Sequence, residues 1–433
     1  TVFESTGRSL NLETTREKLA EGVYLTHLSA RKFKTSLLSA QFMTPVAEQT
    51  AAEQALLPAV LRRGTARYPD MGALSAELDR LYGAEIDYTV RKKGECQCVG
   101  FVASFIDDAF APGGEKLLEP VTALLGQVLC DPARRGGRFL PEYVDGERTN
   151  LVDAIRSILN DKRDYADLRL LQEMCAGEPY GVSRFGDEAS ARALTEKAVH
   201  GAYDRLLSSA PLELFYCGSA ELSRVRDALS GALAALPART ALPLPQSRKH
   251  PARSEVKRVT DEMDVTQGKL GMGFSCGEGS FSALMMGNTL FGGSSNAKLF
   301  MNVREKLSLC YYASSVFHRQ KGIITVSSGI EFQNFQRAYD EILRQLAAVQ
   351  NGELEPWELE GARSTLCSAY ASVGDSQSKL ENFWLGQTAT GRSDTPEELA
   401  AGIRAVSAEE ICAAMRSVSL DTVYFLKGEG AAE

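Results

Sequence analysis

Residues 291–315 read FGGSSNAKLFMNVREKLSLCYYASS, and this stretch predicts a turn, a helix and a strand in direct succession. Gly292 and Gly293 permit a tight turn that side chains would obstruct, and the Ser-Ser-Asn run at 294–296 offers oxygens that can cap a helix. Apolar residues recur at helical spacing over 297–307, and a strand follows from residue 309 to about 317.

Arg304 and Tyr311 stand seven residues apart, one near the end of this helix and the other at the start of the strand. We therefore expect the two side chains to converge, and a guanidinium and a phenol could together hold a peptide carbonyl. The alternative is that Arg304 forms only a surface ion pair, with Glu305 or another neighbour, and that Tyr311 fills the core.

This segment resembles the signature of the C-terminal half in the pitrilysin/insulinase family of zinc peptidases, which includes the mitochondrial processing peptidases. The resemblance implies that Arg304 and Tyr311 bind substrate backbone beside a metal. It extends over nearly the whole chain, through LLPAVLRRGTARYP, LDRLYGAEI, NDKRDYADLR, EPYGVSRFG and QGKLGMGF. Within the family, the sequence is most similar to the bacterial non-catalytic subunits, which lack zinc and are encoded beside an active homologue.

The family holds its zinc on a helix that reads His-x-x-Glu-His, with a further Glu ligand on a later helix. The matching segment here is QALLPAVLRRGT, residues 54–65, which places Ala55 and Ala59 at the His positions and Pro58 at the Glu position. The later ligand falls at Ala154. Zinc needs three protein ligands, so the resemblance implies no metal on this chain, no catalysis by it, and zinc on a partner subunit.

Composition is that of an ordinary globular protein, with 44% hydrophobic and 24% charged residues. The net charge of −8 argues against generic binding to nucleic acid or to an anionic membrane. No long apolar run or signal peptide is visible, so we expect a cytoplasmic protein.

In that compartment we expect the nine cysteines to be reduced thiols, although Cys96 and Cys98 could chelate a metal. The four histidines are scattered singly, which favours structural roles.

The Pro-rich segment at 237–255 predicts a linker between an N-terminal domain, 1–236, and a C-terminal domain, 256–433. Its basic cluster at 248–253 is predicted to be solvated. Both sides show strands followed by helices. Alternation predicts strands at 36–42, 84–91 and 95–105, with a Lys-Gly turn between the last two, and helical periodicity predicts long helices at 141–175 and 357–390.

This order predicts an α+β fold. The resemblance implies two similar α/β-roll domains, each an antiparallel sheet covered by helices, which form one half of a clamshell enclosure. We therefore expect a heterodimer with a zinc-bearing homologue, in which this inactive subunit clamps an extended peptide, and a homodimer is plausible in isolation.

Two other classes remain open. The chain could be a structural scaffold or peptide-binding protein without a role in proteolysis. It could also be an independent enzyme that uses a nucleophile such as Cys310, although no histidine accompanies that residue at a recognisable place.

Overall fold

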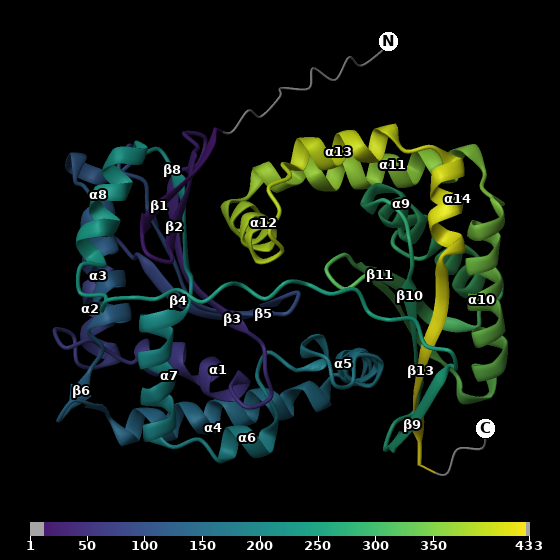
Figure 1. The fold of residues 1–433 in the computed structure, drawn as a ribbon, viewed down its shortest axis with the longest axis horizontal. Helices are drawn as coiled ribbons and strands as arrows, with labels where there is room; N and C mark the ends of the chain where they lie inside the picture. The colour runs from purple at the N-terminus through teal and green to yellow at the C-terminus, as the bar shows by residue number, and fades with distance from the viewer. Residues whose placement is uncertain (1–12, 430–433) are drawn as a thin grey trace.

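Two β-sheets form the frame of the computed structural model, which describes residues 13–429. The first sheet has the strand order β1-β2-β8-β3-β5-β4, and the second has the order β11-β12-β10-β13-β9. In Figure 1 the sheets stand on opposite sides of the molecule, with helices along their outer faces. The strands are β1 Thr14–Ala20, β2 Val23–Ser29, β3 Thr35–Pro45, β4 Glu85–Lys93, β5 Cys96–Ile106, β8 Leu212–Gly218, β9 Lys257–Met263, β10 Gly268–Cys276, β11 Cys310–His318, β12 Ile323–Ile330 and β13 Val418–Gly428, with a short separate hairpin of β6 Arg134–Arg135 and β7 Arg138–Phe139.

Antiparallel pairing dominates, and each sheet has one parallel pair, β2 with β8 and β13 with β9. The central strand β3 is buried on both faces. Leu38, Ala40 and Phe42 point into the core beneath the outer helices, whereas Ser39 and Gln41 lie on the opposite, inner face because successive side chains alternate along a strand. The inner face of the first sheet therefore carries polar side chains at the middle of β3, with apolar clusters on either side of them.

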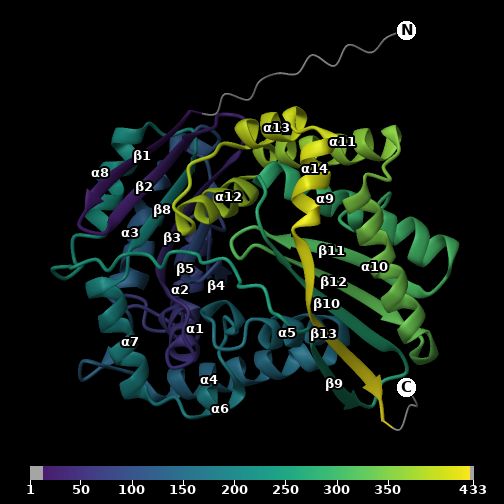
Figure 2. The ribbon, with the colours of Figure 1, turned by 45° about the vertical axis from the view of Figure 1, so that its right-hand side comes forward.

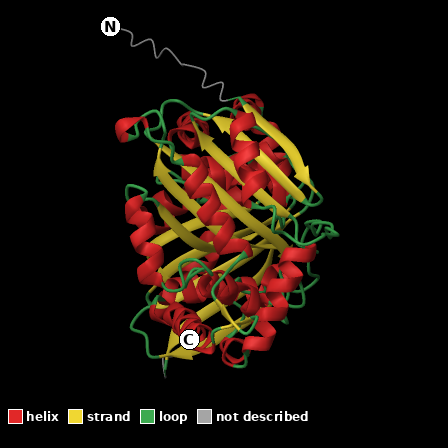
Figure 3. Ribbon diagram, turned by 90° about the vertical axis from the view of Figure 1, so that its left-hand side faces the viewer, coloured by secondary structure: helices red, strands yellow, loops and turns green. Residues whose placement is uncertain are grey.

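Helices cover the outer faces and supply most of the two main cores. In the first core Leu56 of α1 and Leu124 of α3 pack with Leu25 and Phe101 of the sheet, and Figure 3 shows helices gathered around the strands. The helices are α1 Ala51–Leu61, α2 Met71–Arg80, α3 Leu118–Cys130, α4 Pro141–Ser157, α5 Lys162–Met174, α6 Glu188–Arg192, α7 Glu196–Ser209, α8 Leu222–Ala232, α9 Phe281–Phe291, α10 Phe335–Asn351, α11 Pro356–Ala371, α12 Gln377–Ala389, α13 Pro396–Ala405 and α14 Ala408–Arg416.

The two halves of the chain, residues 13–236 and 256–429, exchange one helix each. Helix α5 of the first half packs on β10 and β13, and helix α12 of the second half packs on β3 and β8; Figure 2 shows both placements. Glu381 of α12 accepts two hydrogen bonds from Arg91, at 2.6 and 2.7 Å, and one from the Ser39 hydroxyl at 2.7 Å. The inner face of each sheet is thus covered by a helix from the other half.

Two glycines of β10 leave room for α5. A Cβ on Gly273 would lie 2.5 Å from the Met174 sulfur, and one on Gly271 would lie 3.2 Å from Leu170. The glycines of QGKLGMGF therefore permit close contact between the halves, which strand propensity alone does not explain.

Each of the two long predicted helices is divided in the structure. The pattern at 141–175 breaks at Ile158–Asn160, because the Asp161 side chain accepts the Arg163 and Asp164 N–H groups and starts α5 as a new helix. The pattern at 357–390 breaks at Ser372–Asp375, after which Ser376 caps α12. These breaks release α5 and α12 to cross to the opposite sheet.

The prediction that the basic cluster at 248–253 is a solvated run is wrong for part of it. His250 is buried, and Arg253 donates to an Asp421 carboxylate oxygen at 3.2 Å. The buried Asp421 carboxylate pairs with both side chains, but only His250 leaves solvent, and Arg253 stays exposed. The domain boundaries themselves stay a prediction, because α5 and α12 each pack on the sheet of the opposite half.

Across residues 13–429, no helix has both the length and the apolar character that a membrane crossing requires.

Candidate functional site

Helix α1 is the segment predicted to match the zinc helix, and it is buried along its whole length. Pro58 lies inside it and costs one backbone hydrogen bond, because proline has no N–H. At the following turn, Gly64 is required by space, since a Cβ there would lie 2.6 Å from the Pro69 backbone. The Thr65 hydroxyl accepts the Tyr68 N–H at 3.0 Å. The Gly-Thr pair thus fixes the direction in which the chain leaves α1.

A cavity of about 160 Å³ lies between α1, α4 and β4. Ala55, Ala59 and Ala154 all line it, so the structure brings together three of the four positions predicted to be degenerate. Pro58 lies elsewhere on the helix, next to Phe42 in the core. The methyl groups of three alanines leave this cavity with little polar surface.

The described lining of this cavity does not fit a zinc ion. Its one carboxylate is Glu147, whose two oxygens lie 2.9 Å from Arg63 Nε and 3.0 Å from the Asn150 amide nitrogen. A zinc site needs at least three protein ligands, and a carboxylate already paired with a guanidinium is a poor one. The cavity therefore offers no means of activating water through a metal.

Residues 291–315 fold in the predicted order, but the helix is a π-helix, η4 (Leu299–Lys306). The Leu307 N–H bonds to the Asn302 carbonyl, five residues back, at 3.1 Å. Ser308 then adopts a left-handed φ of 49°, which turns the chain into β11. Helical periodicity predicted a helix here, but it does not distinguish an α-helix from a π-helix.

The turn before η4 is held against β11. A Cβ on Gly292 would lie 2.6 Å from Leu299 and 2.8 Å from the Ser315 hydroxyl, so a side chain has no room there. The Gly292 carbonyl accepts the Ser315 N–H at 2.9 Å. The prediction that the 294–296 run caps the helix is wrong, because no side chain caps η4 and the Ser294 hydroxyl donates to the Thr289 carbonyl of α9 instead.

Arg304 and Tyr311 both reach the surface. The Arg304 side chain is 41% exposed, with its Nε 3.5 Å from Glu305 and its guanidinium 4.6 Å from the centre of the Phe300 ring. Tyr311 is 57% exposed, and its hydroxyl donates to Glu331. The alternative in which Tyr311 fills the core is therefore wrong, whereas the predicted ion pair of Arg304 with Glu305 is present. In the described chain no hydrogen bond joins Arg304 to Tyr311.

A β-bulge explains why Tyr311 is exposed. Cys310 pairs opposite Ile330 and Tyr312 opposite Gly329, which leaves Tyr311 as the extra residue. Bulges redirect side chains at sheet edges, and β11 is the terminal strand of its sheet. The hydrogen bond to Glu331 raises the pKa of the Tyr311 phenol above its ordinary value, so at neutral pH the phenol is a hydrogen-bond donor.

One cluster in the described chain has the residue types of a metal site. Cys175, Glu178 and His250 each bring a possible ligand atom to within 4.8 Å of the others. His250 Nδ1 lies 2.6 Å from Glu178, and Nε2 lies 3.2 Å from Asp421. The second oxygen of Glu178 pairs with the ammonium of Lys321.

The charges in this cluster identify an ion-pair network instead. Desolvation alone would lower the pKa of His250, but hydrogen bonds to Asp421, Cys175 and Glu178 outweigh it and raise the pKa to about 10. Both ring nitrogens of the resulting imidazolium are donors, which leaves none for a metal. Lys321 also bonds Glu95 at 2.8 Å. We call Glu95, Glu178, His250, Lys321 and Asp421 the junction network, because it joins the linker to both halves.

Sequence reasoning missed the junction network because its members are far apart in the chain and follow no spacing. His250 lies in a Pro-rich segment without periodicity. The one sequence signal for this network is a histidine among the linker cations.

The nine cysteines are all free, and seven of them are buried. Desolvation raises the pKa of both Cys96 and Cys98 to about 12, and they pack with the apolar side chains of Met43 and Leu385. Protonated thiols in apolar surroundings do not support the alternative of a chelated metal. Burial likewise raises the pKa of Cys310, which disfavours a nucleophilic role.

Comparisons with known proteins agree with this geometry. A family model described as the peptidase M16 inactive domain matches residues 193–366. The probable inactive metalloprotease YmfF of Bacillus subtilis is 33% identical over 411 residues, which cover 94% of this chain and 96% of that protein.

Two crystal structures are similar over almost the full length. A conserved protein from Enterococcus faecalis has a TM-score of 0.89 and 27% identity, with 97% of this chain and 100% of that chain covered. The peptidase M16 inactive domain from Pseudomonas fluorescens has a TM-score of 0.79 and 17% identity, with 98% and 100% covered. The second likeness shows the fold alone.

These matches confirm the resemblance to the pitrilysin/insulinase type and the predicted α+β fold. Both the family model and the relative from Bacillus subtilis are described as inactive. The chain therefore belongs to the peptidase M16 family, as one of its inactive, non-catalytic members.

Proposed function

We propose that this chain is the non-catalytic subunit of a split zinc peptidase, in which a homologous partner carries the zinc and this chain holds the peptide. The observation that carries the proposal is the exposure of Arg304 and Tyr311 beside a terminal strand. Neither side chain fills the core, so folding alone does not account for the pair. The alanine-lined cavity at α1 supports the part of the proposal that places zinc on the partner, because its described lining lacks the ligands for a metal.

In this proposal an extended peptide adds to the β11 edge, and the Arg304 guanidinium and the Tyr311 phenol donate hydrogen bonds to its carbonyls. Glu305 and Glu331 are the present partners of the two side chains, and the peptide takes their place. The chain contributes position rather than bond-breaking groups, which lowers the barrier by fixing the substrate in one geometry.

We further propose a cytoplasmic complex that binds neither nucleic acid nor membrane, and a homodimer of this chain when the partner is missing. Nine free cysteines and a net charge of −8 support this view. Light scattering measures the molar mass of the purified chain alone and of its mixture with the partner, and so tests both the homodimer and the complex.

The decisive experiment compares this chain, a zinc-bearing homologue encoded beside it, and a mixture of the two, by peptide turnover and bound zinc. We expect zinc only in samples with the homologue, and turnover that rises on mixing. Unchanged turnover on mixing would favour a scaffold role. Zinc-dependent cleavage by this chain alone would overturn the proposal.

A further inference from the structure

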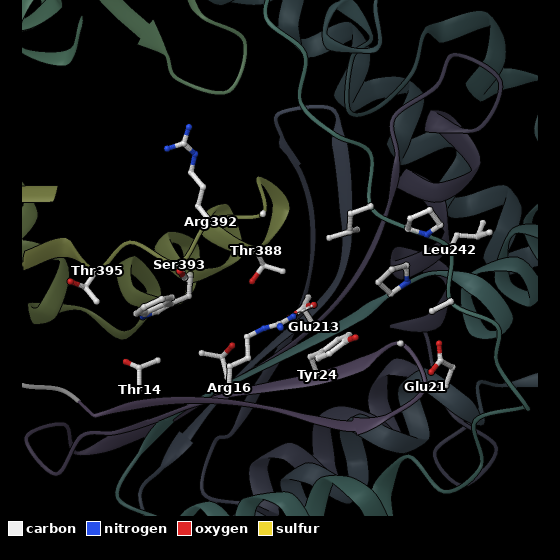
Figure 4. Close-up of a pocket in the computed structure, with 18 residues that line it drawn as sticks. Thr14, Arg16, Glu21, Tyr24, Glu213, Leu242, Thr388, Arg392, Ser393 and Thr395 are labelled. Atoms are coloured by element: carbon white, nitrogen blue, oxygen red, sulfur yellow. Dashed lines mark hydrogen bonds and ion pairs between the residues drawn. The ribbon is translucent and has the colours of Figure 1, made fainter. Parts of the chain in front are cut away.

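Two adjoining cavities lie where the linker passes the end of α12. The smaller, of about 530 Å³, is lined by linker residues 244–247 and 249 with residues 319–320 and 388–392. The larger, of about 970 Å³, shares Leu244, Thr388, Gly391 and Arg392 with it and is drawn in Figure 4. Together they form one cleft, built from both halves of the chain and the linker.

The smaller cavity has an excess of positive charge. Lys249, Arg319 and Arg392 line it, and no acidic side chain does. The Asp394 carboxylate lies 2.8 Å from Arg319 and 3.9 Å from Arg392. Within residues 13–429 the Lys249 ammonium donates only to the Gly277 carbonyl, at 3.0 Å. One carboxylate thus pairs with two of the three cations.

The Arg319 guanidinium packs on an aromatic ring and keeps one N–H donor unpaired within the described chain. Its guanidinium lies 3.8 Å from the centre of the Phe281 ring, and its buried Nε has no hydrogen-bond partner within the described chain. Desolvation, followed by repulsion from Arg319, lowers the pKa of Arg392 below its ordinary value. An anion between the two guanidinium groups would supply an acceptor for the unpaired Nε–H of Arg319 and a second carboxylate partner for Arg392, whose distance to Asp394 is 3.9 Å.

The linker beside this charge offers unpaired main chain. The Leu242 N–H bonds to Ser209 at 2.9 Å and the His250 N–H bonds to Lys321 at 2.8 Å, and between them no backbone group of the described linker has a backbone partner. The buried Ser247 hydroxyl is also without a partner in the described chain. Extended backbone with free hydrogen-bonding groups can pair with an extended peptide.

The larger cavity can accept the rest of such a ligand. Trp384 and Tyr24 line it, and the buried indole N–H of Trp384 has no partner in the described chain. On the sheet side Arg16 pairs with Glu213 at 2.7 Å. Figure 4 shows Arg16, Tyr24 and Glu213 close together, with Arg392 extending away from them. Aromatic walls with a few polar groups suit a peptide with small apolar side chains.

We propose that this cleft binds the C-terminal end of an extended peptide, with the terminal carboxylate between Arg319 and Arg392 and the main chain along the linker. The inference rests on the proposed function only in taking the ligand to be a peptide. It requires neither the zinc-bearing partner nor Arg304 and Tyr311.

The test uses Trp384 as a reporter in the full chain. The protein has two tryptophans, and Trp357 is exposed, so the Trp357→Phe background leaves Trp384 alone. An N-acetylated six-residue peptide of Ala, Ser and Leu is titrated as the free acid and as the C-terminal amide, at constant ionic strength. We expect the acid to bind at least about tenfold more tightly than the amide, since only the acid forms charge-assisted hydrogen bonds.

Variants place the effect in the cleft. In the same background, Arg392→Ala should abolish the preference for the acid, and Lys249→Ala, at an exposed position, should reduce it. Arg404→Ala removes an exposed arginine outside both cavities and should leave the preference intact. Equal binding of acid and amide to the parent protein would overturn the proposal, and so would a preference that survives both cleft variants.

Inorganic phosphate serves as a third probe. Quenching of Trp384 by phosphate with no response to either peptide would overturn the peptide assignment and indicate a phosphate-bearing small molecule. Because these titrations use the isolated chain, their failure is distinct from a failure of Arg304→Ala to alter turnover in the mixed complex.

Discussion

The cavity beside α1 and the surface at η4 and β11 differ in the side chains that they present to a ligand. The first is lined by Ala55, Ala59 and Ala154 and neutralises its one carboxylate internally, whereas the second presents Arg304 and Tyr311 to solvent. Alanines in a buried cavity serve packing, so the fold survives without metal ligands. An exposed cation and phenol add little to packing, and their placement therefore points to binding.

The largest expected effect comes from rebuilding the ligand set in the first region. Ala55→His, Ala59→His and Ala154→Glu place two imidazoles and a carboxylate around one cavity. We expect one zinc per chain with a dissociation constant below about 1 μM, measured by metal analysis after dialysis. No peptidase activity should appear, because Pro58 supplies no base.

The single variant Ala55→His is the control, since one ligand should not retain stoichiometric zinc. A triple variant that folds, by circular dichroism, and yet binds no zinc would show that these positions do not converge on one metal.

The two regions lie in different halves of the chain, and we expect the junction network to hold these halves together. His250→Ala leaves Glu178 and Asp421 without their shared buried partner, so we expect a loss of about 3–5 kcal/mol in the free energy of unfolding. Urea denaturation at pH 6 measures it. A loss below 1 kcal/mol would show that the halves are held mainly by α5 and α12.

The pH dependence of this loss has a definite sign. The pKa of His250 is raised from 6.5 to about 10 in the folded chain, so its contribution is complete below pH 6.5 and disappears as pH rises through 10. The difference between the wild type and His250→Ala should therefore shrink from pH 6 to pH 10. Arg404→Ala, at an exposed position, should show no such trend.

A smaller effect is expected in the second region. Arg304→Ala should lower turnover of the mixed complex by roughly tenfold, because about 1.4 kcal/mol of substrate positioning is lost with one charge-assisted hydrogen bond. Zinc content should stay constant. Arg404→Ala is again the matched control, and equal turnover in the two variants would exclude Arg304 from the clamp.

The smallest effect is expected from Tyr311→Phe, which removes one hydroxyl and keeps the ring. A neutral hydrogen bond contributes about 0.5–1.5 kcal/mol, so turnover of the complex should fall roughly two- to tenfold. The free energy of unfolding should hardly change, because the side chain is exposed. A folding defect with normal turnover would assign Tyr311 to the fold instead.

The sequence predicted the elements whose signals are local. The strands expected at 36–42, 84–91 and 95–105 agree with β3, β4 and β5 to within three residues at each end, because alternation and the Lys-Gly turn between the last two lie in the chain itself. The breaks before α5 and α12 have capping signals at Asp161 and Ser376, which the continuous helical periodicity hid.

The sequence by itself determined the α+β class, the membership of the family, and the lack of ligand side chains at Ala55 and Ala59 of α1, because residue type and near spacing carry that information. Only the tertiary structure decided that α5 and α12 cross between the sheets, that His250 is buried between two carboxylates, and that a bulge turns Tyr311 outward. Each of these depends on contacts between residues far apart in the chain, and a local pattern contains no record of such contacts.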